Sequence, residues 1–114
     1  MFGGSIEVLA LPAGEASQRK LLRSVFFKGI AAAVPEALSA ARAVGLENWM
    51  RQLIATAFDD ANASLARRLE ERSIRHAVRR TEEMAAASDL LTELGVAPRV
   101  SATSRDWLAE LARR

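Results

Sequence analysis

The 114-residue sequence has no cysteine and no tyrosine, only one histidine, and few aromatic side chains. Without cysteine the chain forms no disulfide and no thiolate metal site, which suits a reducing compartment, so we expect a cytoplasmic location. A single histidine excludes a metal site built on several histidines, and we expect no bound metal. No apolar run reaches the ~20 residues that cross a bilayer, and no signal peptide begins the chain, so no membrane partner is expected.

An excess of charge of one sign is also missing. Sixteen lysines and arginines stand against 14 acidic residues, which leaves a net charge of +2. A nucleic-acid module normally carries a larger positive charge and aromatic residues beside its arginines, so no nucleic-acid partner is expected. Neither a glycine-rich phosphate loop nor a Ser-His-Asp arrangement is present. This chain alone is therefore predicted to bind no dinucleotide cofactor.

What the sequence does contain is alanine and leucine, which make up most of its hydrophobic half and favour helix over strand. The stretch Gly14–Leu46 predicts one long central helix that ends at Gly45, because glycine accepts the left-handed conformation that closes helices. Pro35 predicts a kink; the alternative is two helices with a turn near Val34. A buried apolar stripe at helical spacing is predicted along this helix, at Leu22, Phe26, Gly29 or Ile30, Ala33, Ala37, Ala40 and Val44.

Shorter helices are predicted to pack on this central one. The first is expected over residues 46–58 and the second over 61–71, with Asp59-Asp60 as the stop and new cap between them. A third is expected over 73–94, with Ser73 as its cap and Gly95 as its stop, and a last helix is capped by Ser101 or Ser104. Leu65, Leu69, Ile74, Leu91, Trp107 and Leu108 are among the residues expected to face inward. The predicted fold is therefore all-α, with one long kinked helix and three to four shorter ones.

The first twelve residues are predicted to differ from the rest. Residues 6–11 have strand character at their start and are followed by Pro12. A lone strand needs a pairing partner, so these residues either pair with something outside this chain or form an extended arm. We expect residues 1–12 to be an N-terminal arm and residues 13–114 to be the helical domain.

Lys20 is the strongest candidate for chemistry. It lies near the start of the long predicted helix, with Arg23 and Ser24 three and four residues later. If Lys20 lies against apolar side chains such as Phe27, desolvation makes its proton labile, and it becomes a general acid or base for a carbonyl and hydroxyl pair. The alternative is an ordinary solvated charge at a helix start.

The arginine-rich stretch from Arg67 to Arg80 has two interpretations. One is a solvated face with local ion pairs, in which Glu82 and Glu83 pair with Arg79 or Arg80. The other is a surface for phosphate or carboxylate, which arginine forks bind bidentately. Within it, His76 is either an exposed or capping residue, or its ring lines a cleft beside Arg80.

The spacing of several residues resembles a known family. Gly14, Lys20-Leu21, Glu36-Ala37 and Gly45-Leu46 match, without a gap, the start of the C-terminal helical domain of the β-hydroxyacid dehydrogenase superfamily. That group includes 3-hydroxyisobutyrate dehydrogenase, 6-phosphogluconate dehydrogenase and the imine reductases. Residues 20–29 and 76–84 look like a subgroup of NAD(P)-dependent oxidoreductases whose C-terminal domain is catalogued only as a domain of unknown function.

The resemblance implies a role for each candidate residue. Lys20 corresponds to the family's catalytic lysine, and Arg23 and Ser24 replace its two asparagines at the substrate. A Lys-Asp pair that many members carry on a later helix falls on Glu82-Glu83, so the substrate class does not carry over. With His76 and Arg80, the predicted substrate-binding set is Arg23, Ser24, His76 and Arg80.

The resemblance also implies what surrounds this domain. Residues 6–11 in the N-terminal arm would be the last strand of a nucleotide-binding domain that is missing upstream. NAD or NADP would be bound in the full-length enzyme by a nucleotide-binding domain in the same or another polypeptide, and the helical domain would form a homodimer. The leading expectation is thus the C-terminal helical domain of an NAD(P)-dependent oxidoreductase, inactive alone. The alternatives are a stand-alone helical dimerisation or regulatory module without activity, and a general interaction bundle unrelated to dehydrogenases.

Overall fold

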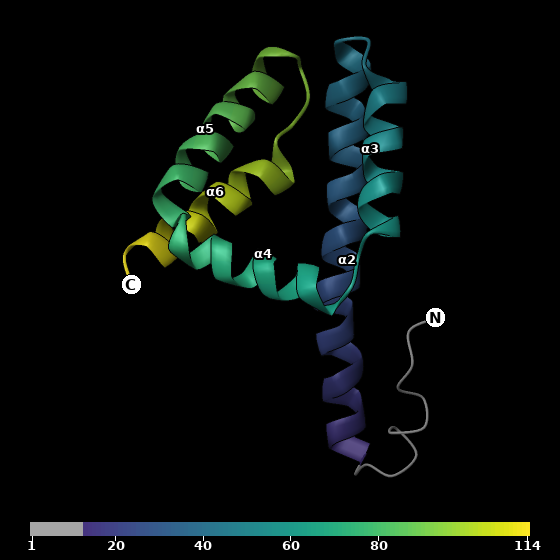
Figure 1. The fold of residues 1–114 in the computed structure, drawn as a ribbon, viewed down its shortest axis with the longest axis vertical. Helices are drawn as coiled ribbons and strands as arrows, with labels where there is room; N and C mark the ends of the chain where they lie inside the picture. Colours follow the sequence, from purple (N-terminus) through teal and green to yellow (C-terminus); the bar gives the residue numbers. More distant parts are fainter. Residues whose placement is uncertain (1–12) are drawn as a thin grey trace. The chain divides into compact units, whose positions relative to one another are not determined.

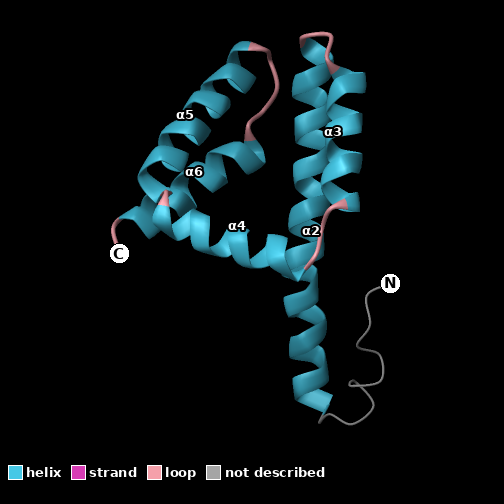
Figure 2. Cartoon of the chain, viewed as in Figure 1, coloured by secondary structure: helices cyan, strands magenta, loops and turns pink. Residues whose placement is uncertain are grey.

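A computed structural model describes residues 13–114, which form helices only and contain no strand (Figures 1 and 2). The helices are α2 (Ala13–Ala43), α3 (Glu47–Asp59), α4 (Ala63–Arg75), α5 (Ala77–Glu93) and α6 (Arg99–Ala112). The predicted all-α fold, one long helix with shorter ones, is confirmed. The predicted arm, residues 1–12, lies outside the described residues.

The long helix α2 is continuous through Pro35. The alternative of two helices with a turn near Val34 is therefore wrong. A bend at Pro35 stays a prediction. The chain divides within α2 into two compact units, Met1–Ala32 and Ala33–Arg114. Each unit is described by itself below.

Two glycines end helices as predicted. Gly45 and Gly95 both have φ of 76°, in the left-handed region. After each glycine, a backbone hydrogen bond between residues five apart closes the helix. The Leu46 N–H donates to the Ala41 carbonyl, and the Val96 N–H donates to the Leu91 carbonyl, both at 2.8 Å. These bonds satisfy carbonyls that the helix end leaves unpaired.

The predicted boundary at Ser73 is wrong. Helix α4 runs through Ser73 to Arg75, and α5 begins at Ala77 after a single non-helical residue. The Ser73 hydroxyl donates to the Leu69 carbonyl at 2.7 Å, which is how serine is accommodated inside a helix. The cap of α4 is Asn62, whose side chain accepts the Leu65 N–H at 2.9 Å, so Asp60 is not the new cap.

The start of α6 also differs from the prediction. It begins at Arg99, directly after Pro98, and neither Ser101 nor Ser104 caps it. The cap comes from α2: the Glu36 carboxylate accepts the Val100 N–H, the Ser101 N–H and the Ser101 hydroxyl, each at 2.8 Å. A carboxylate at a helix N-terminus satisfies unpaired N–H groups and complements the helix dipole.

The core of the second unit is small. Its buried residues are Ala41 on α2 and Ala77, Ser88 and Leu91 on α5. Helices α5 and α6 pack extensively on each other, and the turn at Gly95 joins them (Figure 1). Leu91 was expected inside, and it is 6% exposed.

Much of the predicted apolar interior is instead exposed. Leu22 and Phe26, expected in the buried stripe of the long helix, are 68% and 61% exposed. Leu69, Ile74 and Trp107, also expected inside, are more than half exposed. Helical spacing marks which residues share a face, but a face is buried only where another element covers it. None of the described helices is long and apolar enough to span a membrane.

Candidate functional site

The first candidate group lies on the N-terminal part of α2. At 3.6 residues per turn, Lys20, Ser24 and Phe27 share one side of the helix. The Ser24 hydroxyl donates to the Lys20 carbonyl at 3.3 Å, so its hydrogen is used inside α2 while its lone pairs can still accept. The Lys20 side chain is exposed. The apolar cover that would make its proton labile is therefore not supplied by the described residues of this chain.

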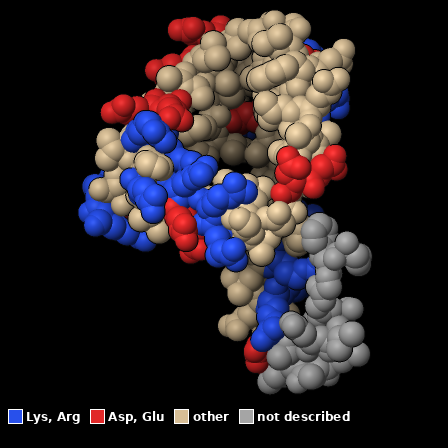
Figure 3. Space-filling model, in the orientation of Figure 1, with Lys and Arg blue, Asp and Glu red and all other residues tan. Residues whose placement is uncertain are grey.

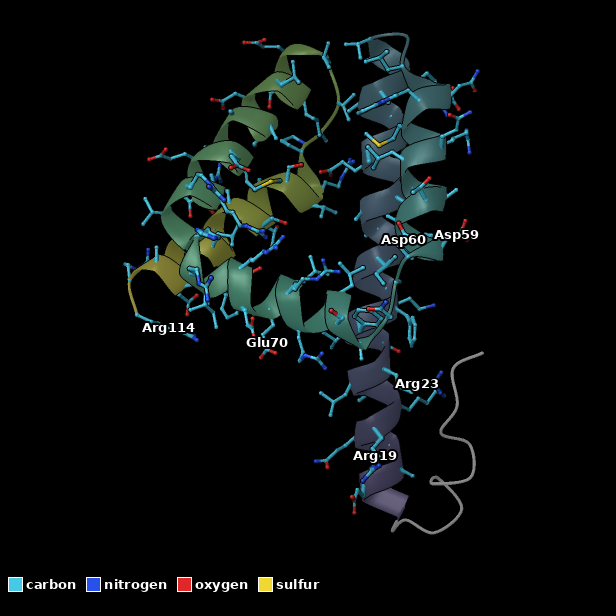
Figure 4. All side chains as sticks on the ribbon, in the orientation of Figure 1. Arg19, Arg23, Asp59, Asp60, Glu70 and Arg114 are labelled. Atoms are coloured by element: carbon cyan, nitrogen blue, oxygen red, sulfur yellow. The ribbon has the colours of Figure 1, made fainter. Side chains whose placement is uncertain are left out.

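Arginine, not lysine, covers the aromatic ring of this face. The Arg23 guanidinium carbon lies 5.7 Å from the centroid of the Phe27 ring, within the range of a cation–π contact. The Phe26 and Phe27 rings contact edge to face, with centroids 5.0 Å apart. Figure 4 shows Arg19 and Arg23 on this part of α2, where Arg19 also pairs with Glu15 at 3.2 Å. The planar Arg23 group is thus held beside the Lys20 face.

The other side of the same helix segment is apolar and uncovered. Leu21, Leu22, Val25 and Phe26 are each between 61% and 74% exposed. At 100° per residue they lie away from the side that carries Lys20 and Ser24. The segment therefore presents a polar, cationic face and an apolar face on opposite sides.

The second candidate group surrounds His76, where α4 ends and α5 begins. His76 has φ of −112° and ψ of 28°, so the backbone leaves the helical path at this one residue. Its N–H donates to the Arg72 carbonyl at 2.9 Å and its carbonyl accepts the Arg80 N–H at 2.9 Å. His76 is thus a capping residue through its backbone, and the residue as a whole is half-buried.

Arginines dominate the surroundings of the His76 ring. Partial desolvation lowers the pKa of His76 below its usual value, and the charges of Arg79, Arg75, Arg80 and Arg72 lower it further, because a second positive charge among them is unfavourable. At neutral pH the imidazole is neutral. Figure 3 shows Lys and Arg side chains gathered over α4 and the start of α5.

Of these arginines, only one forms an ion pair within the described part of the chain. Arg79 contacts Glu83 at 3.4 Å, as the sequence predicted for that pair. Arg72, Arg75 and Arg80 have no ion pair or side-chain hydrogen bond among residues 13–114. Arg80 is half-buried. Because no carboxylate within residues 13–114 pairs with its guanidinium group, the N–H donors of Arg80 are available to a ligand.

The two groups belong to different units. Lys20, Arg23 and Ser24 are in the first, and His76 and Arg80 are in the second. That all five line one substrate cleft stays a prediction. Over residues 13–114, no group of three or more potential ligands could hold a metal ion.

Two features were missed by sequence reasoning. Burial raises the pKa of Glu36, but hydrogen bonds from Val100, Ser101 and Arg99 lower it more, so the net pKa is below its usual value. No local signal pairs residue 36 with residue 100. The second feature is a shallow groove on α3, lined by Trp49, Gln52, Leu53 and Thr56, which the spacing of Trp49 and Leu53 could have indicated.

Comparison with known proteins identifies one family. Residues 41–111 match the family described as a domain of unknown function (DUF1932). The match covers α3 to α6 with the last turn of α2, and Lys20 lies before it. No curated protein and no solved structure matches the chain.

Proposed function

This chain belongs to the DUF1932 family, and we propose that it is the C-terminal helical domain of an NAD(P)-dependent oxidoreductase of the 6-phosphogluconate dehydrogenase-like type. The proposal joins the family match over residues 41–111 with the spacing of Gly14, Lys20 and Glu36 in the segment before it. The nucleotide would be bound by a separate nucleotide-binding domain, since this chain has no glycine-rich phosphate loop.

In this function Lys20 supplies a proton. When a carbonyl or imine is reduced, negative charge develops on the substrate heteroatom, which must then be protonated. An ammonium group within hydrogen-bond reach stabilises that charge and donates the proton. Ser24 offers lone pairs to a substrate donor, and Arg23 offers a planar fork to a substrate carboxylate or phosphate. His76 and Arg80 would hold a further part of the substrate.

The observation that carries this proposal concerns residues 14–32. This segment has a cationic face and an apolar face, and none of its large side chains is buried. In proteins most of the stability of a helix comes from packing of its apolar side against a neighbour. A second domain or second chain over this segment would bury the apolar residues and could desolvate Lys20. A desolvated ammonium gives up its proton more readily than a solvated one.

The test uses a protein in which this chain is combined with a nucleotide-binding domain. The coding sequence upstream of Met1 is read first, for a strand, a Gly-x-Gly-x-x-Gly turn and a helix. The combined protein is then assayed for reduction of small carbonyl and imine compounds by NADH and NADPH. A combined protein that binds neither nucleotide contradicts the proposal.

A second function is favoured by the position of the family match. Because the match begins at Ala41, it does not include Lys20. This favours a stand-alone helical dimerisation or regulatory module, which needs the fold but no catalytic lysine. In that case no nucleotide-binding domain accompanies the chain, and changes at Lys20 alter no activity.

Both functions predict a homodimer that buries the apolar side of α2. Placing a charge in that contact, as Leu22→Asp or Phe26→Asp, should raise the dimer dissociation constant at least 100-fold, because a buried unpaired carboxylate is very unfavourable. Light scattering over a concentration series measures this. Leu90→Asp, at another exposed leucine, is the matched control and should leave the dimer intact. A monomeric wild-type chain at high concentration would rule out the predicted dimer.

A further inference from the structure

We propose that the corner between α4 and α5 binds a phosphate monoester, through Arg72, Arg75, Arg80 and the ring of His76. We call these four residues the arginine corner. That the phosphate belongs to a substrate rests on the proposed function. The binding itself needs only this chain, so it can be tested separately.

The helical spacing places the four residues together. Arg72 precedes His76 by four residues and Arg80 follows it by four, so both lie about one turn from the corner, and Arg75 is adjacent. The His76 N–H donates to the Arg72 carbonyl and the His76 carbonyl accepts the Arg80 N–H, at 2.9 Å each, so these bonds hold the backbone of the corner. The charges of Arg75, Arg80 and Arg72 each lower the pKa of His76, in keeping with their positions within about one turn of it.

Among the described residues, some arginines are paired with a carboxylate, whereas others, including Arg67 and Arg68 on α4, are not. Arg19, Arg42, Arg51, Arg79, Arg105 and Arg114 each contact a carboxylate within 3.4 Å. Among the described residues, Arg72, Arg75 and Arg80 have no such carboxylate, although Glu70, Glu71 and Glu82 are close in sequence. Three neighbouring guanidinium groups repel one another, and an anion bound between them would relieve that repulsion.

The number and geometry of the donors favour phosphate over carboxylate. One guanidinium fork satisfies both oxygens of a carboxylate, whereas a phosphate monoester offers three oxygens and about two negative charges. Three guanidinium forks supply donors for all three oxygens, and their three positive charges exceed the negative charge of the monoester. The neutral ring of His76 can add one N–H. The helix dipoles give no net preference, because the positive end of α5 and the negative end of α4 meet at His76.

The experiment titrates the 114-residue chain by calorimetry and by NMR of the imidazole and guanidinium signals. Glycerol 3-phosphate represents a substrate phosphate and adenosine 2′-phosphate represents the phosphate of a dinucleotide cofactor; malonate is the dicarboxylate control. All are measured at about pH 8, where the monoester is fully dianionic. We expect both monoesters to bind at least 10-fold more tightly than malonate, and the tighter of the two identifies the source of the phosphate.

Variants locate the site. Arg72→Ala, Arg75→Ala and Arg80→Ala should each weaken monoester binding about 10-fold or more, the usual effect of losing a charged hydrogen bond. Arg80→Lys should also weaken it, because lysine keeps the charge but lacks the fork. Arg51→Ala on α3 removes the same charge elsewhere and should have little effect.

Three results would overturn the proposal. One is the absence of binding by either monoester, and another is equal affinity for malonate. The third is equal weakening by Arg51→Ala, which would mean a general charge effect. Arg72 and Arg75 are exposed, so their variants should fold even if Arg80→Ala does not, and circular dichroism checks this. Binding by the corner without any reductase activity in the combined protein would leave this site standing and reject the oxidoreductase.

Discussion

Replacing Lys20 with methionine should lower the turnover of the combined oxidoreductase by about 10²- to 10⁴-fold, the usual contribution of a positioned general acid or base. Methionine keeps the length of the side chain and removes its proton. The Michaelis constant for the nucleotide should hardly change, because this chain is not expected to bind it. Turnover and both Michaelis constants are measured together, so that a loss of binding is separated from a loss of proton transfer.

The chain provides its own control for this experiment. Lys28 is the other lysine, two turns further along α2, and its side chain is also exposed. Lys28→Met makes the same chemical change on the same helix and should leave turnover within about twofold. Lys20→Arg should be nearly as inactive as Lys20→Met, because an arginine does not release its proton at neutral pH. Normal turnover in Lys20→Met would remove Lys20 from the mechanism.

The helical content and helix ends that depend on local chemistry could be predicted from sequence. Gly45 and Gly95 mark their helix ends because the left-handed conformation is a property of one residue. The ion pair between Arg79 and Glu83 follows from their spacing on one helix. Pro35 was correctly placed inside one helix, because the apolar spacing continues in phase beyond it.

Features that depend on distant contacts could not be predicted. Ser73 can cap a helix or bond back to the preceding turn, and only the path of α4 decides between the two. The cap of α6 comes from Glu36, so local search around Ser101 and Ser104 could not find it. Leu22 and Phe26 form an apolar face whether or not a partner covers it, so their exposure was not visible in the pattern.

The candidate residues show the same division. Lys20 and Ser24 lie on one face of α2, as their spacing requires, and that much is local geometry. Whether Lys20 is desolvated depends on a surface that the described residues do not supply. The arginine corner falls between these cases: the run of arginines is visible in sequence, whereas their lack of carboxylate partners is visible only in the structure.

Removing the Glu36 carboxylate should destabilise the second unit by about 2 kcal/mol, the upper part of the range for losing a helix cap. Glu36→Ala leaves the Val100 and Ser101 N–H groups and the Ser101 hydroxyl without their acceptor in a half-buried place. For a domain of this size the loss corresponds to a fall of roughly 10 °C in melting temperature. Glu36→Gln keeps one acceptor oxygen and should show a smaller effect. Glu82→Ala, at an exposed glutamate of α5 that has no ion pair within residues 13–114, should change stability by less than about 0.5 kcal/mol.

Acid titration distinguishes two ways in which Glu36 can stabilise the second unit: capping of α6 by its carboxylate, and packing of its side chain. Hydrogen bonds to its carboxylate outweigh burial and hold the pKa of Glu36 below the ordinary value of 4.5, so the folded state favours the charged form. The corresponding stability is present above pH 4.5 and is lost as the pH falls through the lower folded-state pKa. Over that acid range the wild-type chain should therefore lose more stability than Glu36→Gln, and the two melting temperatures should converge. If they stay equally far apart down to the acid limit, the carboxylate charge does not hold α6 in place, and Glu36 acts through its shape alone.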